Sequence, residues 1–322
     1  MRRQFLAWAL LGSFLLIGAS CNRSNKKRIG VVPKAVSHVF WQSVHAGAEA
    51  AARELDVEIE WSGPAAETDF ARQIAIVESM INGRIDGIVL APTEATSMVT
   101  VVERAAKAGI PVSIFDTGIN TDEYVSFVST NNHAAGALAA RELAGLLEGE
   151  GTVAVVKGVP GSSSTMERER GFEEAIAAEF PGIRIVAEQY GMSDVAKALA
   201  VTENMLTAHP DLDGLFASGE PATVGTAQGI KSRELIGKIR YVGFDSSESL
   251  ETDLRAGVID SLIVQDPFKI GYEAVKTVVA KLNGEAPAKR IESPATVVTG
   301  ENIDTAEIDK LLHPDLSEYL GE

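Results

Sequence analysis

The stretch Arg28-Ile-Gly-Val-Val-Pro33 and the segment Phe40 to Leu55 that follows it decide the fold of this chain. The first is a short β-branched run that ends at a proline, a pattern that favours a strand. The second is apolar at helical spacing, so it predicts a helix with one buried stripe. That stripe consists of Phe40, Val44, Ala48, Ala51 and Leu55. A strand followed by a helix that covers it is the repeating unit of a parallel α/β sheet.

The unit recurs along the chain in two series. The first series continues with strands expected at Val57 to Trp61, Gly87 to Ala91 and Val112 to Phe115. The second begins with a strand at 125–129 and a helix at 132–147, and more strands and helices follow. We therefore predict an α/β protein with two similar doubly wound parallel-sheet lobes.

The limits of the lobes follow from this pattern. We assign residues 28–129 and 266–297 to lobe 1 and residues 130–265 to lobe 2. Residues 298–322 form a C-terminal extension, in which we expect a short helix packed across the lobes. No Pro-rich or Ser-rich linker divides the lobes, so we expect the chain to cross between them on short ordered segments, which suits a hinge.

The N-terminus has the pattern of a cleaved signal peptide over residues 1–20. It has a cationic start and an apolar run at 5–17, which is shorter than the roughly 20 residues of a spanning helix. Small residues then lead to Cys21, as in bacterial lipoprotein signals, which this segment resembles. Gly18 stands where a bulky aliphatic residue is usual, so cleavage by ordinary signal peptidase is the alternative. We expect an exported, periplasmic or cell-surface protein with a lipid anchor at Cys21 and a tether at 21–27.

The amino-acid composition limits the kinds of partner and of covalent cross-link that this protein can have. The chain carries a formal net charge of −16, and such an acidic surface repels phosphate backbones, which argues against nucleic-acid binding. Its single cysteine excludes an intrachain disulfide. About 300 mature residues are enough for two domains with separate cores.

Ligands of open α/β sheets bind beyond the carboxyl ends of the strands, so the residues just after each strand are the place to look for a site. Those positions are rich in carboxylates, amides, an arginine and aromatic rings. Carboxylates and amides bind hydroxyl groups, and aromatic rings cover the C–H faces of a sugar. The strand-end positions include Ser37, His38, Phe40, Trp41, Thr93, Glu94, Asp116, Thr117, Asn131, Asn132, Arg168, Ser193, Gly219, Glu220, Phe244, Asp245 and Gln265.

Enzyme motifs are missing from the sequence. No Gly-x-Gly-x-x-Gly follows the first strand, no Gly-x-Ser-x-Gly is present, and the five histidines show no metal-ligand spacing. The segment Gly158 to Thr165 is rich in glycine and serine, but it lacks the Gly-Lys-Ser/Thr ending of a P-loop. We therefore expect neither an enzyme nor a bound metal or cofactor.

From about Arg28 to Val298 the chain resembles the periplasmic sugar-binding proteins of the ribose-binding type, the substrate-capturing components of ABC importers. This resemblance implies the type I periplasmic binding protein fold, a monomer, and an ABC permease as partner. The residues that carry it are Phe40-Trp41 with Gly47, Ile114-Phe-Asp116, Thr130-Asn-Asn132 with Gly136, Arg168-Glu-Arg170-Gly171-Phe172, Thr207-Ala-His-Pro-Asp-Leu-Asp213, Val242-Gly-Phe-Asp245 and Gln265.

The resemblance also implies the contacts of a sugar or polyol. They fall on His38, Phe40, Trp41, Asp116, Asn132, Arg168, Phe244, Asp245 and Gln265, and further candidates are Thr117, Asn131, Ser193, Gly219 and Glu220. Ribose binders have an arginine at the place of Thr117, Asn-Asp at Gly219-Glu220, and an asparagine at His38, so the identity of the ligand stays open.

Several of these residues also have a purely structural interpretation. Asp116 could cap a turn, and Arg168 could belong to a solvated charged helix face. Asn131 and Asn132 compete for the N-cap of the same helix. At the level of function, the alternative to a transport protein is a receptor for a small signalling molecule or a chemoreceptor ligand with the same fold. A lactose-repressor-type regulator shares the two-lobed core, but it would carry a basic helix-turn-helix where this chain has a signal sequence.

Overall fold

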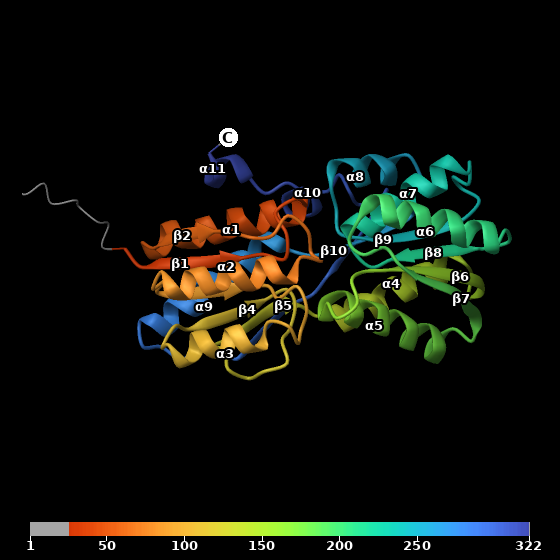
Figure 1. Cartoon of the computed structure of the whole chain (residues 1–322). Helices are drawn as coiled ribbons and strands as arrows, with labels where there is room; N and C mark the ends of the chain where they lie inside the picture. Colours follow the sequence, from red (N-terminus) through yellow and green to blue (C-terminus); the bar gives the residue numbers. More distant parts are fainter. Residues whose placement is uncertain (1–25, 322) are drawn as a thin grey trace, which may run out of the picture.

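The computed structural model describes residues 26–321, and Figure 1 shows two lobes side by side. The expected signal peptide, the anchor residue Cys21 and most of the tether lie outside the described residues. Each lobe contains a six-stranded sheet with helices packed against both faces. The predicted fold class, two doubly wound parallel-sheet lobes, is confirmed. Within residues 26–321, no helix is both long enough and apolar enough to cross a bilayer.

Lobe 1 has the strand order β11-β5-β4-β3-β1-β2, and every neighbouring pair is parallel. The four central strands are short, largely buried and rich in Val and Ile, as expected where helices cover both faces, whereas the two edge strands, β11 and β2, are partly exposed. Its elements are β1 (Arg28–Val32), α1 (Val39–Leu55), β2 (Glu58–Trp61), α2 (Phe70–Asn82), β3 (Gly87–Leu90), α3 (Val99–Lys107), β4 (Val112–Phe115), β5 (Phe127–Thr130), α9 (Pro267–Leu282) and β11 (Arg290–Ser293).

Lobe 2 repeats the plan with the order β12-β10-β9-β8-β6-β7, in which only β12 is antiparallel to its neighbour. Its elements are α4 (Asn132–Leu146), β6 (Glu150–Lys157), α5 (Ser163–Glu179), β7 (Gly182–Tyr190), α6 (Val195–Ala208), β8 (Gly214–Ala217), α7 (Glu220–Ser232), β9 (Arg240–Phe244), α8 (Glu248–Arg255), β10 (Ser261–Val264) and β12 (Thr296–Thr299).

Glycines let one pair of helices in each lobe pack backbone to backbone. In lobe 1, a Cβ on Gly47 of α1 would lie 1.9 Å from the carbonyl oxygen of Phe268 on α9. In lobe 2, a Cβ on Gly136 of α4 would lie 1.9 Å from the carbonyl oxygen of Arg168 on α5. Any side chain at these two positions would push the paired helices apart. The glycines therefore help to fix the positions of α1 and α5, whose first turns face the gap between the lobes.

The chain crosses between the lobes three times, after β5, after β10 and between β11 and β12. The first two crossings are tied together, because the Thr130 hydroxyl donates a 2.7 Å hydrogen bond to Oε1 of Gln265. The third crossing corrects the expected limit of lobe 1. Residues 296 and 297, assigned there from the sequence, pair with β10 in lobe 2, with Val297 opposite Ile263. Sequence periodicity marks a strand, but it does not say which sheet edge the strand joins.

The C-terminal strap, residues 300–321, contains α10 (Ala306–Leu312) and α11 (Leu316–Leu320) and touches both lobes. Ile308 of α10 packs into the core of lobe 2. On the other side, α11 packs on α1, where the Arg53 guanidinium lies 4.9 Å from the Tyr319 ring centroid and donates to the Tyr319 carbonyl at 3.1 Å. Figure 1 shows α11 above α1 and α10 close to the junction of the lobes.

Candidate ligand-binding site between the lobes

A small cavity, here called the inner cavity, lies between the lobes and has a volume of about 40 Å³. That is room for about one water molecule, so the two lobes are closed on each other in this structure. Polar and aromatic side chains from both lobes form its walls. The lining residues are Lys34, His38, Phe40, Trp41, Glu67, Asp116, Thr165, Arg168, Ser193, Gly219, Glu220, Pro221, Asp245 and Gln265.

Two aspartates occupy matching places in the two lobes. Asp116 follows β4 and Asp245 follows β9, and both have left-handed backbones with φ of 57° and 67°. The amide of each donates a 2.9 Å hydrogen bond to the next strand, from Asp116 to Val128 and from Asp245 to Ile263. A left-handed backbone is costly for a residue other than glycine and tends to mark functional sites. In each lobe, the residue with this left-handed backbone has its carboxylate at the cavity wall. Asp116 therefore does more than cap a turn.

The Asp116 carboxylate pairs with a buried lysine. Nζ of Lys34 lies 3.0 Å from Oδ2 of Asp116, and the Thr117 hydroxyl donates to the same oxygen at 2.7 Å. Burial by itself would lower the pKa of Lys34. The carboxylates of Asp116 and Glu67 outweigh that effect and leave the pKa above its ordinary value. Lys34 therefore remains an ammonium group inside the closed site.

Arg168 is the cation of lobe 2, and it is only 2% exposed, so it is not part of a solvated helix face. Its Nε donates to Oδ1 of Asn132 at 2.8 Å, and its Nη1 donates to the carbonyl of Ser218 at 3.0 Å. The guanidinium carbon lies 3.8 Å from the ring centroid of Phe244, a cation–π contact. These three partners hold the planar group with Nη1 3.9 Å from Oδ2 of Asp245.

Asp245 accepts hydrogen bonds from two other elements. Nε2 of Gln265 donates to Oδ1 at 2.6 Å, and the backbone amide of Glu220 donates to Oδ2 at 3.0 Å. Burial raises the pKa of Asp245, and the Arg168 guanidinium and the Gln265 amide oppose that rise only in part. Because Gln265 also accepts from Thr130, this carboxylate is connected to the crossings between the lobes.

Glu67 was not among the residues predicted from the sequence. It lies between β2 and α2, and its carboxylate accepts from Nε1 of Trp41 at 3.3 Å and from the hydroxyl of Ser193, in lobe 2, at 2.9 Å. It also lies 3.7 Å from Nδ1 of His38 and 3.8 Å from Nζ of Lys34. Glu67 is therefore a lobe 1 carboxylate that reaches across to lobe 2.

Glu220 begins α7 and adds a fourth carboxyl group. Burial, together with the charges of Asp245 and Glu67, raises the pKa of Glu220 to about 8. One of its oxygens, Oε2, is buried without a hydrogen-bond partner among the described residues. The preceding residue, Gly219, lines the cavity without a side chain, and a Cβ there would lie 3.9 Å from Nη1 of Arg168.

Four of the residues predicted from the sequence do not line the inner cavity. Asn132 and Phe244 hold Arg168 from behind, and Thr117 supports Asp116 and shares a 2.9 Å hydrogen bond with the Ser164 hydroxyl across the lobes. Asn131 caps α4 by accepting from the amide of Ala134 at 3.1 Å. The ten other predicted residues do line it: His38, Phe40, Trp41, Asp116, Arg168, Ser193, Gly219, Glu220, Asp245 and Gln265.

The lining residues outside the predicted set of ligand contacts are Lys34, Glu67, Thr165 and Pro221. Lys34 had a usable signal, because it stands directly after the first apolar strand, where the strand-end rule applies. Glu67 had none, because it lies in the middle of a loop and reaches the site only through folding.

The site offers four carboxyl groups, two cations and two aromatic side chains, Phe40 and Trp41, in one small cavity. Carboxylates accept hydrogen bonds from hydroxyl groups, while the lysine and arginine donate to oxygens. Within residues 26–321, no group of three or more His, Cys, Asp or Glu side chains is placed to hold a metal ion. This chemistry suits capture of a hydroxylated molecule.

Known proteins share this organisation. A family model described as "Periplasmic binding protein domain" matches residues 29–286. A D-ribose/D-allose-binding protein of Pseudomonas aeruginosa is 29% identical over 92% of this chain and 98% of its own length. A solute-binding protein of Agrobacterium vitis, solved with D-fucose, is 36% identical over 89% of this chain and 100% of its own, with a TM-score of 0.86. One from Agrobacterium radiobacter, solved with D-arabinose, is 32% identical over 90% of this chain and 99% of its own, with a TM-score of 0.87.

Proposed function

The chain belongs to the periplasmic binding protein family, and from that premise we propose that it captures a sugar or polyol between its closing lobes and delivers it to an ABC permease. The observation that carries this proposal is the pair of strand-end carboxylates. Asp116 comes from lobe 1 and Asp245 from lobe 2, yet both line one enclosed cavity. A ligand that binds both makes more contacts in the closed form than in the open form, so it shifts the population toward closure.

Selectivity follows from the same groups. A hydrogen bond between a hydroxyl and a carboxylate contributes about 1.5–3 kcal/mol net, and a ligand without that hydroxyl leaves a buried charge unpaired. The aromatic side chains of Phe40 and Trp41 supply the surface for the C–H face of the ring. Opening of the lobes and movement of the Lys34 side chain off the Asp116 carboxylate provide the room that the closed cavity lacks.

Asp116→Ala and Asp245→Ala test the site directly. We expect both variants to lose the thermal shift that the wild type shows with its ligand from a panel of pentoses, hexoses and polyols. Circular dichroism without ligand should show a folded protein in each case. Asp211→Ala, at an exposed aspartate outside the cavity, is the matched control and should keep the wild-type shift. Binding that survives in both site variants would rule out this cavity as the binding site.

The proposal also covers how the protein is attached to the membrane and what receives its ligand. As a periplasmic binding protein the chain is exported, and we propose that it is a monomer tethered by a lipid on Cys21. Cys21→Ser should release it from membranes into the soluble fraction, and mass spectrometry of the wild-type N-terminus should find acyl chains. An unmodified N-terminus would favour ordinary signal cleavage.

Uptake of the labelled ligand by cells with and without the chain separates import from presentation of the ligand to a receptor.

A further inference from the structure

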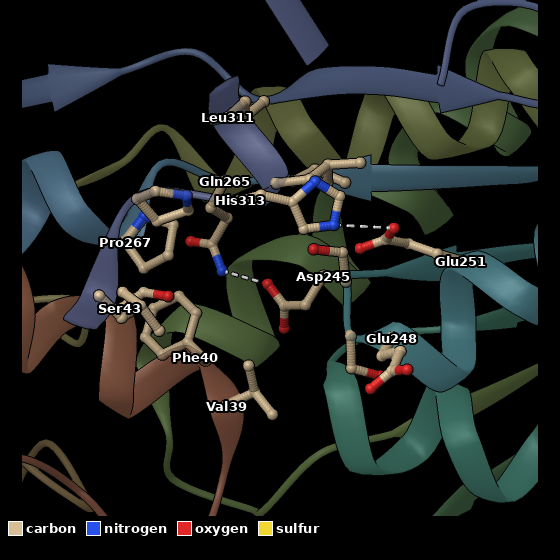
Figure 2. A pocket seen from close by; sticks show the side chains of 16 residues that line it. Val39, Phe40, Ser43, Asp245, Glu248, Glu251, Gln265, Pro267, Leu311 and His313 are labelled. Atoms are coloured by element: carbon tan, nitrogen blue, oxygen red, sulfur yellow. Dashed lines mark hydrogen bonds and ion pairs between the residues drawn. The ribbon is translucent and has the colours of Figure 1, made fainter. Parts of the chain in front are cut away.

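A second and much larger space lies beside the inner cavity. This outer chamber has a volume of about 520 Å³ and is shown in Figure 2. Its walls come from the start of α1, the start of α8, the second crossing between the lobes and the C-terminal strap. The volume falls within the roughly 300–1,000 Å³ that is usual for small-molecule sites.

Three residues line both spaces: Phe40, Asp245 and Gln265. In Figure 2, Gln265 and Asp245 point toward each other, and their 2.6 Å hydrogen bond forms part of the partition. A group bound to Asp245 from the inner cavity is therefore one side chain away from the outer chamber. A ligand that replaces the Gln265 bond can extend from one space into the other.

The outer chamber has an apolar side. Phe40, Pro267 and Leu311 line it, and Val39 stands at its edge. Val39 is 42% exposed and is one of few large apolar side chains at the surface of the described chain. A sugar ring offers C–H faces to such a surface.

Polar and acidic side chains line other parts of the outer chamber. Ser43 contributes a hydroxyl, and α8 contributes Glu248 and Glu251 close to its first turn. Glu251 is paired with Nε2 of His313 at 3.1 Å, whereas the Glu248 carboxylate has no ion-pair partner within residues 26–321. A hydroxyl group can donate to Glu248. A phosphate, a sulfate or a uronic acid would be repelled, since Asp245 adds a further carboxylate.

We propose that the outer chamber receives a second, uncharged sugar residue that is glycosidically linked to the one in the inner cavity, so that the ligand is a disaccharide or a short glycoside. The inference rests on the proposed function, because the first sugar residue binds in the inner cavity. It assigns a purpose to the C-terminal strap, whose Leu311 and His313 complete the chamber.

A matched pair of tryptophan substitutions tests this proposal. Val39→Trp places a large side chain at the chamber, whereas Val36→Trp changes the same residue type three positions earlier, at 44% exposure and outside both spaces. Calorimetric titrations compare lactose, melibiose, cellobiose, maltose and xylobiose with D-galactose, D-glucose and D-xylose. We expect the wild type to bind one disaccharide at least about tenfold more tightly than its constituent monosaccharides.

Val39→Trp should then weaken the binding of that disaccharide by about tenfold or more and leave the affinity for monosaccharides unchanged. Val36→Trp should alter neither affinity. Equal or tighter binding of monosaccharides by the wild type would overturn the second-residue proposal and leave the proposed function standing. A disaccharide affinity that is the same in both tryptophan variants would overturn it as well. If neither these saccharides nor the pentoses, hexoses and polyols of the thermal-shift panel bind, the proposed function fails too.

Discussion

Asp116 and Asp245 occupy the same place in the two lobes, but their counterions differ. Each follows a buried strand and has a left-handed backbone. Each carboxylate also has its own cation: Lys34 for Asp116 and Arg168 for Asp245. Asp116 is joined to the Lys34 ammonium at 3.0 Å. Asp245 lies 3.9 Å from the Arg168 guanidinium and takes its closest hydrogen bond, at 2.6 Å, from the neutral amide of Gln265.

The difference teaches that a repeated backbone plan does not repeat its electrostatics. In lobe 1 a point charge on a flexible stem neutralises the carboxylate. In lobe 2 a planar cation is held in place by Asn132, the Ser218 carbonyl and the Phe244 ring, so it is preorganised and less free to move. We therefore expect Lys34 to swing toward the incoming ligand, while Arg168 stays where it is.

The largest expected effect is on the stability of the ligand-free protein. Asp116→Ala leaves the buried Lys34 ammonium with Glu67, 3.8 Å away, as its nearest carboxylate, and breaking a buried pair in this way costs about 3–5 kcal/mol. Asp245→Ala removes a carboxyl whose pKa burial already raises, but it leaves the Gln265 and Glu220 donors unpaired, so its cost should be smaller, about 1–3 kcal/mol. Urea denaturation measures both. Adding Lys34→Met to Asp116→Ala should recover part of the loss, and equal losses in the two single variants would contradict the asymmetry.

A pH effect of intermediate size concerns Glu220, which lies close to Asp245. Its folded pKa of about 8 exceeds the ordinary value of 4.5, so between these values the folded state keeps a proton that the unfolded state has released. Stability therefore falls as pH rises through that window. Glu220→Gln should remove the slope and stabilise the protein by on the order of 3 kcal/mol at pH 8 and above. Thermal melts from about pH 4 to 9 measure this pH dependence of stability. A Glu220→Gln variant that keeps the wild-type slope would refute the assignment of the slope to Glu220.

A smaller effect is expected on closure. The Ser164 hydroxyl of lobe 2 contacts two lobe 1 groups, the Thr117 hydroxyl at 2.9 Å and Nζ of Lys34 at 3.3 Å. Ser164→Ala should cost the closed form about 1 kcal/mol, a change of about fivefold in the ratio of closed to open molecules. Small-angle scattering should report a larger mean radius. Ser232→Ala, which removes contacts made within lobe 2 alone, should leave the radius unchanged.

The smallest effect concerns the hold of the C-terminal strap on lobe 2. The pKa of His313 is raised by its hydrogen bond to Asp309 and by Glu251, although partial burial opposes this. The stabilisation is therefore complete below the ordinary value of 6.5 and is lost as pH rises through the folded pKa. Because His313 is half exposed, His313→Gln should cost less than about 1 kcal/mol. Hydrogen exchange in α10 should speed up in this variant at pH 6 and not at pH 9.

Much of the candidate site could be read from single positions, because the ends of parallel strands meet at one edge of a sheet. Asp116, Asp245 and Gln265 were found in this way, and the structure brings them to one cavity. Asn132 and Phe244, which the resemblance also assigns to the ligand, do not line that cavity and contact Arg168. A strand-end rule gives the neighbourhood of a side chain, and it does not say whether that side chain points into the cavity or stands behind one that does.

The amino-acid sequence by itself determined the two βα series and the placement of polar groups after their strands, because periodicity and strand ends are local properties of the chain. Only the tertiary structure decided that Glu67 reaches from a loop to Ser193, that β12 joins the sheet of lobe 2, and that the C-terminal strap completes an outer chamber. Each of these depends on segments that are far apart in the chain and meet only through long-range packing, which no local pattern encodes.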